Sequence, residues 1–306
     1  MAQRERYGDL PTEQRNPRLR HLDTRSELEL VETIHEQDQE ALAAVGRAGV
    51  AVAGLVRLAV RALGGGGRLV YVGAGTSGRL AALDAAECPP TFGVRPSRVV
   101  AVIAGGRRAL HRAVEGAEDS RPDGAEALRR LGVGPLDLVC GVSASGVTPF
   151  VLGGLAEARR RGCATALVTC GAEAPARRLA DAVVALDVGA EAVAGSTRMK
   201  AGLATKAVLH TLTTAAMIRL GRVHDNLMVD LRPTSRKLRR RAIRIVAELT
   251  GLGVGPSARL LARADDSPKL AAVMHHRGVD LRGARALLRR SGGHLRPLLE
   301  EDPREP

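Results

Sequence analysis

The chain has 306 residues, a formal net charge of +13 and 45% hydrophobic residues, which is typical of a globular protein with a sizeable core. No apolar run reaches the ~20 residues that cross a bilayer. The N-terminus carries charges where a signal peptide would place its apolar stretch. The sequence therefore predicts a cytoplasmic protein with no membrane partner.

Charge and cysteine content argue against two classes of function. The 46 basic residues include only four Lys, and no aromatic residue stands among the runs of Arg to stack on bases, so we expect no nucleic-acid partner. The four Cys residues form no Cys-x-x-Cys pair and lie far from any group of His, so we expect no disulfide framework and no metal site. Buried apolar positions are predicted for Cys88, Cys140, Cys163 and Cys170.

The first segment, residues 1–55, is predicted to be an N-terminal arm and helix. Residues 1–25 are polar and contain Pro, which is typical of an extended arm. Ser26 and Glu29 have the spacing of a capping box, in which each side chain accepts a hydrogen bond from the other residue's backbone N–H. A second apolar helix is predicted over about 49–63, ending at the glycine run 64–67.

Short apolar strands then alternate with segments that can be helical. Strands of this kind imply βαβ units, so residues 56–235 predict an α/β domain built on a doubly wound, parallel five-stranded sheet with flavodoxin-like order 2-1-3-4-5. A long helix is predicted over 197–220, and residues 236–306 read as a small helical domain of three or four short helices. The predicted strands are 68–72, 99–104, 138–142, 165–169 and 182–186.

A glycine-rich turn follows the first strand. It has the spacing Gly-x-Gly-x-x-Gly of a dinucleotide fold, but no acid ends the second strand to hold a ribose. Arg107 and Arg108 could bind the 2′-phosphate of NADP. Nicotinamide cofactors are disfavoured all the same, and we expect no cofactor. Hydroxyls beside the free N–H groups of a helix start instead favour a phosphate cradle, formed by Gly75, Thr76, Ser77 and Gly78.

Two further loops carry hydroxyl groups. The third strand ends in a loop with Ser143, Ser145, Gly146 and Thr148. Strands 1 and 3 flank the switch point of such a sheet, so this loop and the first should converge on one crevice. The loop before the long helix adds possible ligands for a bound anion, namely Ser196, Arg198 and Lys200.

Two acidic positions are candidates for proton transfer. Glu87 lies near the C-terminus of the predicted first helix, where a carboxylate opposes the helix dipole, and Pro89-Pro90 is expected to forbid further helix. A second acidic cluster comprises Glu115, Glu118 and Asp119. Spacing alone favours an exposed acidic turn for this cluster.

Together these segments resemble the N-acetylmuramic acid 6-phosphate etherases of the sugar isomerase (SIS) superfamily. The similar segments run in family order over about three quarters of the chain. They are 12–16 (TEQRN), 73–91 (GAGTSGRLAALDAAECPPT), 114–120 (VEGAEDS), 143–149, 195–202 (GSTRMKAG) and 226–230 (NLMVD).

The resemblance implies a carbon–oxygen lyase that converts N-acetylmuramic acid 6-phosphate and water to N-acetylglucosamine 6-phosphate and D-lactate, in peptidoglycan recycling. It also implies a homodimer that shares active-site residues across its interface. By position in the motifs, Glu87 resembles the acid that protonates the departing lactate, and Glu118 a second acid–base residue. Departures from the family pattern, which bear on substrate contacts, occur at Val147, Leu203 and Thr205.

Three alternatives stay open on sequence alone. A non-catalytic sugar-phosphate sensor, related to the glucokinase regulatory proteins, would use the same loops without turnover. A sugar-phosphate isomerase would interconvert aldose and ketose without forming lactate. A DNA-binding regulator is disfavoured, because no helix-turn-helix precedes the predicted sheet.

Overall fold

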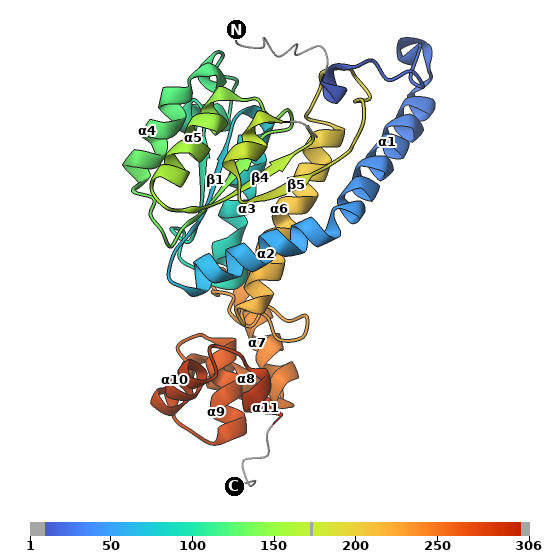
Figure 1. The fold of residues 1–306 in the computed structure, drawn as a ribbon. Coiled ribbons are helices and arrows are strands. Elements are labelled where there is room, and N and C mark those ends of the chain that lie inside the picture. Colours follow the sequence, from blue (N-terminus) through green and yellow to red (C-terminus); the bar gives the residue numbers. More distant parts are fainter. Residues whose placement is uncertain (1–9, 172–173, 301–306) are drawn as a thin grey trace. The chain divides into compact units, whose positions relative to one another are not determined.

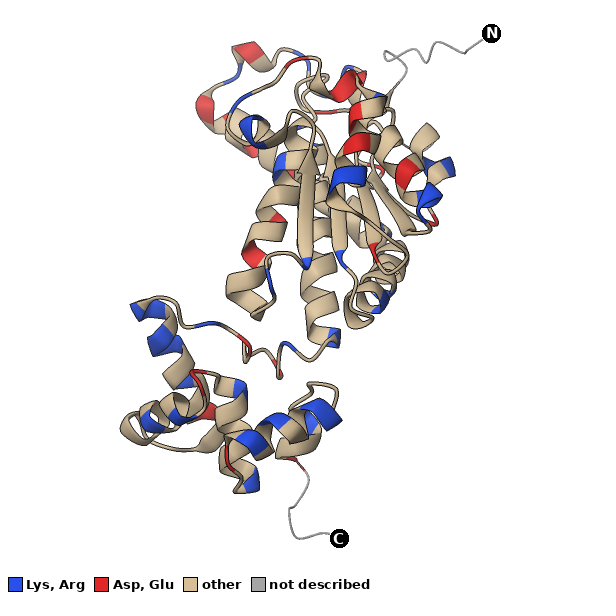
Figure 2. Ribbon diagram, turned by 90° about the vertical axis from the view of Figure 1, so that its left-hand side faces the viewer, with Lys and Arg blue, Asp and Glu red and all other residues tan. Residues whose placement is uncertain are grey.

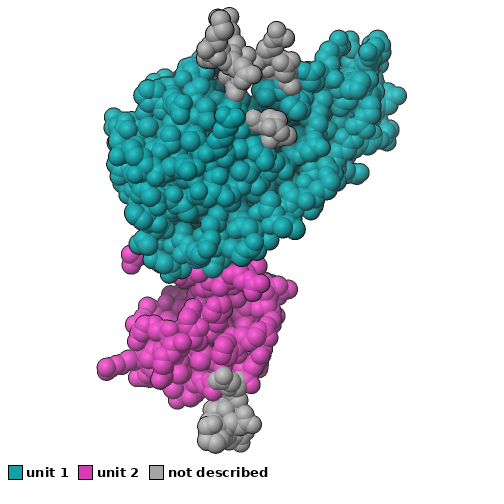
Figure 3. Space-filling view, in the orientation of Figure 1, with its two compact units in different colours: residues 1–85, 97–213 teal, residues 86–96, 214–306 magenta. Residues whose placement is uncertain are grey.

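The computed structural model describes residues 10–171 and 174–300, which fall into two compact units (Figure 3). Unit 1 comprises Met1–Ala85 and Ser97–Thr213, and unit 2 comprises Ala86–Pro96 and Thr214–Pro306. The domain boundaries at 55 and 235 stay predictions. Of the three divisions between the units, those after Ala85 and Thr213 fall inside the helices that span 75–92 and 200–219, and the one after Pro96 falls in a loop.

The N-terminal helices form as the capping pattern predicts. After the short helical turns η2 (Pro11–Glu13) and η3 (Leu22–Thr24) come α1 (Glu27–Arg47) and α2 (Gly49–Gly64). The Ser26 hydroxyl accepts from the Glu29 N–H, and the Glu29 carboxylate accepts from the Ser26 N–H, which confirms the capping box. In the described part of the chain no single helix is long and apolar enough to cross a membrane. Within that part, only α1 and α2, taken together as one bent pair, have the length and composition that a membrane span would need.

All five predicted strands form and pair in parallel in the order β2-β1-β3-β4-β5, which confirms the predicted topology. In register, Gly73 at the end of β1 pairs with Ile103 of β2 and Val142 of β3. The segments that follow these strands therefore leave the sheet at one edge. The strands are β1 (Leu69–Gly73), β2 (Val99–Ile103), β3 (Leu138–Val142), β4 (Ala164–Thr169) and β5 (Ala182–Ala185).

Helices cover both faces of the sheet (Figure 1). Val70 and Val72 join the core beneath α4 (Arg121–Leu131) and α5 (Pro149–Arg160). Because side chains alternate along a strand, Tyr71 points to the other face. There it meets α3 (Gly75–Phe92), which shares that face with α2 and α6 (Lys200–Arg219). This double cover explains the near-continuous apolar sequence of β1 and β3.

The double proline does not end its helix, contrary to the sequence expectation. Helix α3 continues through Pro89 and Pro90 to Phe92, and the Gly93 N–H donates to the Pro89 carbonyl. A proline lacks the N–H that would bond four residues back. In the last turn this removes only two hydrogen bonds, so the chain keeps its helical path and stops at Gly93, whose φ is +65°.

Unit 2 packs short helices around its own apolar core, centred on Ile245, Val246 and Leu261. Its described part holds five helices after α6, where three or four were expected. Lys and Arg positions occur along helices of both units (Figure 2). The five helices are α7 (Arg236–Thr250), α8 (Val254–Arg263), α9 (Pro268–Arg277), α10 (Leu281–Arg290) and α11 (Arg296–Leu299).

Candidate functional site

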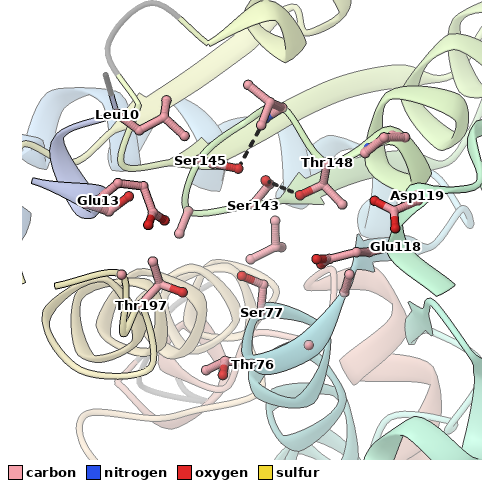
Figure 4. A pocket seen from close by; sticks show the side chains of 18 residues that line it. Leu10, Glu13, Thr76, Ser77, Glu118, Asp119, Ser143, Ser145, Thr148 and Thr197 are labelled. Atoms are coloured by element: carbon pink, nitrogen blue, oxygen red, sulfur yellow. Dashed lines mark hydrogen bonds between the residues drawn. The ribbon is translucent and has the colours of Figure 1, made fainter. Parts of the chain in front are cut away.

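A pocket of about 340 Å³ opens in unit 1 at the carboxyl ends of β1 and β3. Its walls come from the start of α3, the loop between β3 and α5, the acidic turn η5 (Ala117–Asp119), η2, and the loop before α6. The predicted residues that line it are Gly75, Thr76, Ser77, Glu118, Ser143, Ser145 and Thr148. Both hydroxyl-rich loops therefore meet at one site (Figure 4).

The first turn of α3 supplies donors to the pocket floor. Gly75, Thr76 and Ser77 all line the cavity, and the early N–H groups of a helix have no partner within that helix. Gly78 lies behind them, where a Cβ would meet the Ile103 side chain at 2.5 Å. Gly78 therefore lets the helix start pack on β2 rather than lining the pocket.

Side chains of the β3–α5 loop hold that loop in shape. The Ser143 and Thr148 hydroxyls are 2.9 Å apart, and the Gly146 N–H donates to the Ser143 hydroxyl at 2.9 Å. The Val147 N–H donates to the Ser145 hydroxyl at 3.3 Å. Gly146 has a φ of +68°, and a Cβ there would lie 2.2 Å from the Ala174 Cβ. Gly146 thus shapes the loop from outside the pocket lining.

The acidic turn places two carboxylates on the pocket wall. Gly116 has a φ of +72° and reverses the chain into η5, which presents Glu118 and Asp119 to the cavity. Neither carboxylate has a hydrogen-bond or ion-pair partner within the described residues. Composition alone favoured a plain exposed turn here. The structure shows that this exposed turn also borders the pocket.

The loop before α6 contributes differently from the expectation. Thr197 lines the pocket, whereas Ser196, Arg198 and Lys200 do not. The Lys200 amine is buried and donates to Gln37 and Glu40 of α1, each at 3.0 Å. It therefore joins α1 to α6.

The start of α6 is also closed to an anion. The carboxylate of Glu191 accepts from the N–H groups of Lys200 at 2.8 Å and Ala201 at 3.0 Å. Burial raises the pKa of Glu191, although these two bonds favour its ionised form. This carboxylate occupies the place where a phosphate would otherwise meet the α6 dipole.

Glu87 belongs to unit 2, whereas the predicted residues that line the pocket belong to unit 1. It is exposed on α3, ten residues after Ser77, which corresponds to roughly 15 Å along the helix axis. It is not among the residues that line the pocket. The pocket of unit 1 therefore includes Glu118 but not Glu87.

Sequence reasoning missed the contribution of the N-terminal arm. Leu10, Thr12 and Glu13 line the pocket, and the Gly195 N–H donates to the Thr12 carbonyl at 2.9 Å. The segment 12–16 was noted for its likeness to the family, but it was given no role. No local pattern in the sequence joins these residues to a site more than 60 positions away.

The charged side chains among the described residues that line the pocket are all acidic. Its lining contains the carboxylates Glu13, Glu118 and Asp119 and no Lys, Arg or His among the described residues. A bound phosphate would be held by hydroxyls and backbone N–H groups at the α3 start.

Among the described residues, no group of three or more His, Cys, Asp or Glu side chains could hold a metal ion. All four cysteines are buried, as predicted.

Comparison with known proteins relates the chain to named families. Residues 51–159 match the model of the glucokinase regulatory protein N-terminal SIS domain. A phosphoheptose isomerase from Francisella tularensis is 18% identical, with a TM-score of 0.49 over 63% of this chain and 100% of that protein.

Relatives that match almost the whole chain have one name. The N-acetylmuramic acid 6-phosphate etherase of Salmonella agona (strain SL483) is 47% identical over 96% of this chain and 99% of its own length. The etherases of Synechocystis sp. and Salinibacter ruber are 46% and 47% identical, covering 98% and 96% of this chain and 98% and 95% of their own lengths. The chain belongs to the family of N-acetylmuramic acid 6-phosphate etherases.

Proposed function

We propose that this protein cleaves the D-lactyl ether of N-acetylmuramic acid 6-phosphate and releases N-acetylglucosamine 6-phosphate and D-lactate. In this role it is a carbon–oxygen lyase of peptidoglycan recycling and needs no metal or cofactor. The observation that carries the proposal is one pocket in which two hydroxyl-bearing loops and the Glu118 carboxylate meet. We also infer a cytoplasmic location, because a charged sugar phosphate does not cross a membrane unaided.

The phosphate would bind at the start of α3. Thr76 and Ser77 offer hydroxyls there, and the positive end of the helix dipole favours an anion. The Thr148 hydroxyl faces the same cavity from the opposite loop. With the phosphate bound there, the carbon chain of the sugar would extend toward the carboxylates on the pocket walls.

The proposed reaction is an elimination followed by a hydration. Opening of the sugar ring gives an aldehyde, which makes the hydrogen at C2 acidic. A base removes that proton while the C3–O bond breaks, and an acid protonates the oxygen of the departing lactate. Water then adds at C3 of the unsaturated aldehyde and a proton returns to C2. A positioned carboxyl group can contribute ~10²–10⁴-fold to each proton transfer.

Glu118 and Glu87 are the proposed acid–base pair, with Glu87 as the acid for lactate and Glu118 as the second group. Glu87 is not among the residues that line the pocket, so we propose that the active form is a homodimer in which Glu87 reaches the pocket of the partner subunit. Leu83, one turn before Glu87 on α3, is 48% exposed. Helix α1 also exposes apolar side chains that a second copy would cover, namely Leu28, Val31, Ile34 and Leu42.

A lactate-release assay on the purified protein tests the proposal. We expect D-lactate from N-acetylmuramic acid 6-phosphate, and a loss of at least 100-fold in the Glu118→Gln variant. Glu115→Gln is the matched control, because Glu115 is exposed on the same segment and does not line the pocket. Binding without turnover would support the sensor, in line with the regulatory-domain match. Ketose formation without lactate would support the isomerase.

A further inference from the structure

A third carboxylate faces the pocket and has no role in the reaction described above. Glu13 projects into the cavity from the side opposite Glu118, with Ser77 and Ser143 between them (Figure 4). It comes from η2 in the N-terminal arm, whereas Glu118 comes from η5. The two carboxylates therefore flank the space above the proposed phosphate site.

The backbone around Glu13 is held in place. The Glu13 N–H donates to the Leu10 carbonyl at 2.9 Å, and the Thr12 carbonyl accepts from the Gly195 N–H at 2.9 Å. Thr12 is buried. Gly195 approaches so closely that a Cβ there would lie 2.9 Å from a Glu13 carboxylate oxygen. The arm is thus anchored to the loop before α6, and the carboxylate is set at the pocket edge.

The Glu13 carboxylate has no hydrogen-bond or ion-pair partner within the described residues. An ionised carboxylate only accepts hydrogen bonds, and it would repel a phosphate. The described residues that line the pocket supply no cation to neutralise it. The ligand groups that match a bare carboxylate are therefore the O–H and N–H donors of a sugar, and not its phosphate.

We propose that Glu13 recognises the sugar part of the substrate by accepting hydrogen bonds from its hydroxyl or acetamido N–H groups. This inference rests on the proposed function and deepens it. The α3 start holds the phosphate end, and Glu13 orients the carbon chain against Glu118. Glu13 is a specificity-determining residue that discriminates a sugar phosphate from a simple phosphate ion.

The test compares two ligands by calorimetry on the full-length protein, wild type and Glu13→Gln. N-Acetylglucosamine 6-phosphate should bind about tenfold more weakly to the variant, because a hydrogen bond to a charged group is lost. Inorganic phosphate should bind equally well or more tightly, because a repelling charge is removed. The thermal midpoint should not change, and Glu115→Gln should match the wild type for both ligands.

Parallel weakening of both ligands would overturn the proposal, because it would indicate a general disturbance of the pocket. Unchanged binding of the sugar phosphate would overturn it as well. Glu13→Asp, which keeps both acceptor oxygens, should recover part of the sugar affinity. If the wild type released no lactate and Glu13→Gln still weakened only the sugar phosphate, the etherase reaction would be refuted and the role of Glu13 supported.

Discussion

The phenol of Tyr71 donates a hydrogen bond of 2.9 Å to the Asp84 carboxylate, which joins the middle of β1 to α3. The Thr213 hydroxyl donates to the other oxygen of the same carboxylate at 2.9 Å, so α6 is joined as well. Burial raises the pKa of Asp84 to about 6, although both bonds and the nearby Lys206 favour the ionised form. This buried group fixes the helix whose first turn forms the pocket floor.

Asp84→Asn should change how stability depends on pH. A carboxyl with a pKa of about 6 in the fold, against an ordinary value of 3.8, binds its proton more tightly in the folded state. Its contribution is therefore fully present below pH 3.8 and is lost as the pH rises through 6. Between pH 4 and pH 7 the wild type should lose on the order of 2 kcal/mol relative to the variant.

Urea unfolding of both proteins at several pH values measures this difference. Other groups titrate in the same range, so the informative quantity is wild type minus variant. A difference that stays constant from pH 4 to pH 7 would show that Asp84 titrates as an ordinary exposed acid.

Gly146→Ala should destabilise the β3–α5 loop. The substitution is unfavourable for two reasons. The backbone of Gly146 has a φ of +68°, and a Cβ there would lie 2.2 Å from the Ala174 Cβ. Gly132→Ala is the matched control, because Gly132 has a φ of +63° and open space around its Cβ position. The control should lose about 1 kcal/mol of unfolding free energy, and Gly146→Ala should lose at least twice as much. Equal losses would mean that the contact with Ala174 is relieved without cost.

Two serine substitutions should separate ligand binding from loop stability. Ser77→Ala removes a pocket hydroxyl that has no hydrogen-bond partner among the described residues, so KM should rise about tenfold with an unchanged thermal midpoint. Ser143→Ala leaves the Gly146 N–H without its acceptor and should also cost about 1–3 kcal/mol of stability. Steady-state kinetics and thermal melts report both. A thermal shift in Ser77→Ala would assign Ser77 to the fold instead.

Mixing two inactive variants should restore activity if the active site is shared between subunits. Glu87→Gln and Glu118→Gln homodimers each have damaged pockets. After unfolding and joint refolding, about half of the dimers are mixed, and each mixed dimer holds one pocket with both glutamates intact. We expect about a quarter of the wild-type lactate release. If the mixture were as inactive as its components, the proposed sharing of Glu87 and Glu118 would fail.

The sheet and the two hydroxyl loops followed from local sequence patterns. Apolar strands, glycines after β1 and the Ser143–Thr148 loop need no distant partner to be recognised, and parallel topology brings their ends together. Ser26 and Glu29 likewise carry their capping information within four residues.

The remaining parts of the site depend on long-range contacts. Lys200 resembled a ligand for an anion at a helix start, but its amine finds Gln37, 163 residues earlier in the chain. Glu13 lines the pocket next to Thr12, whose carbonyl accepts a hydrogen bond from the N–H of Gly195, far along the chain. In the proposed homodimer, the position of Glu87 relative to a pocket depends on a second subunit. Neither periodicity nor residue type encodes such distant pairings.

The most direct measurement is incubation of the protein with N-acetylmuramic acid 6-phosphate in deuterated water, followed by NMR of the sugar product. Elimination and hydration predict one D-lactate per N-acetylglucosamine 6-phosphate, with deuterium at C2 of the sugar. Lactate released with hydrogen retained at C2 would contradict the proposed removal of the C2 proton to solvent. No lactate at all would contradict the assignment of this pocket to ether cleavage.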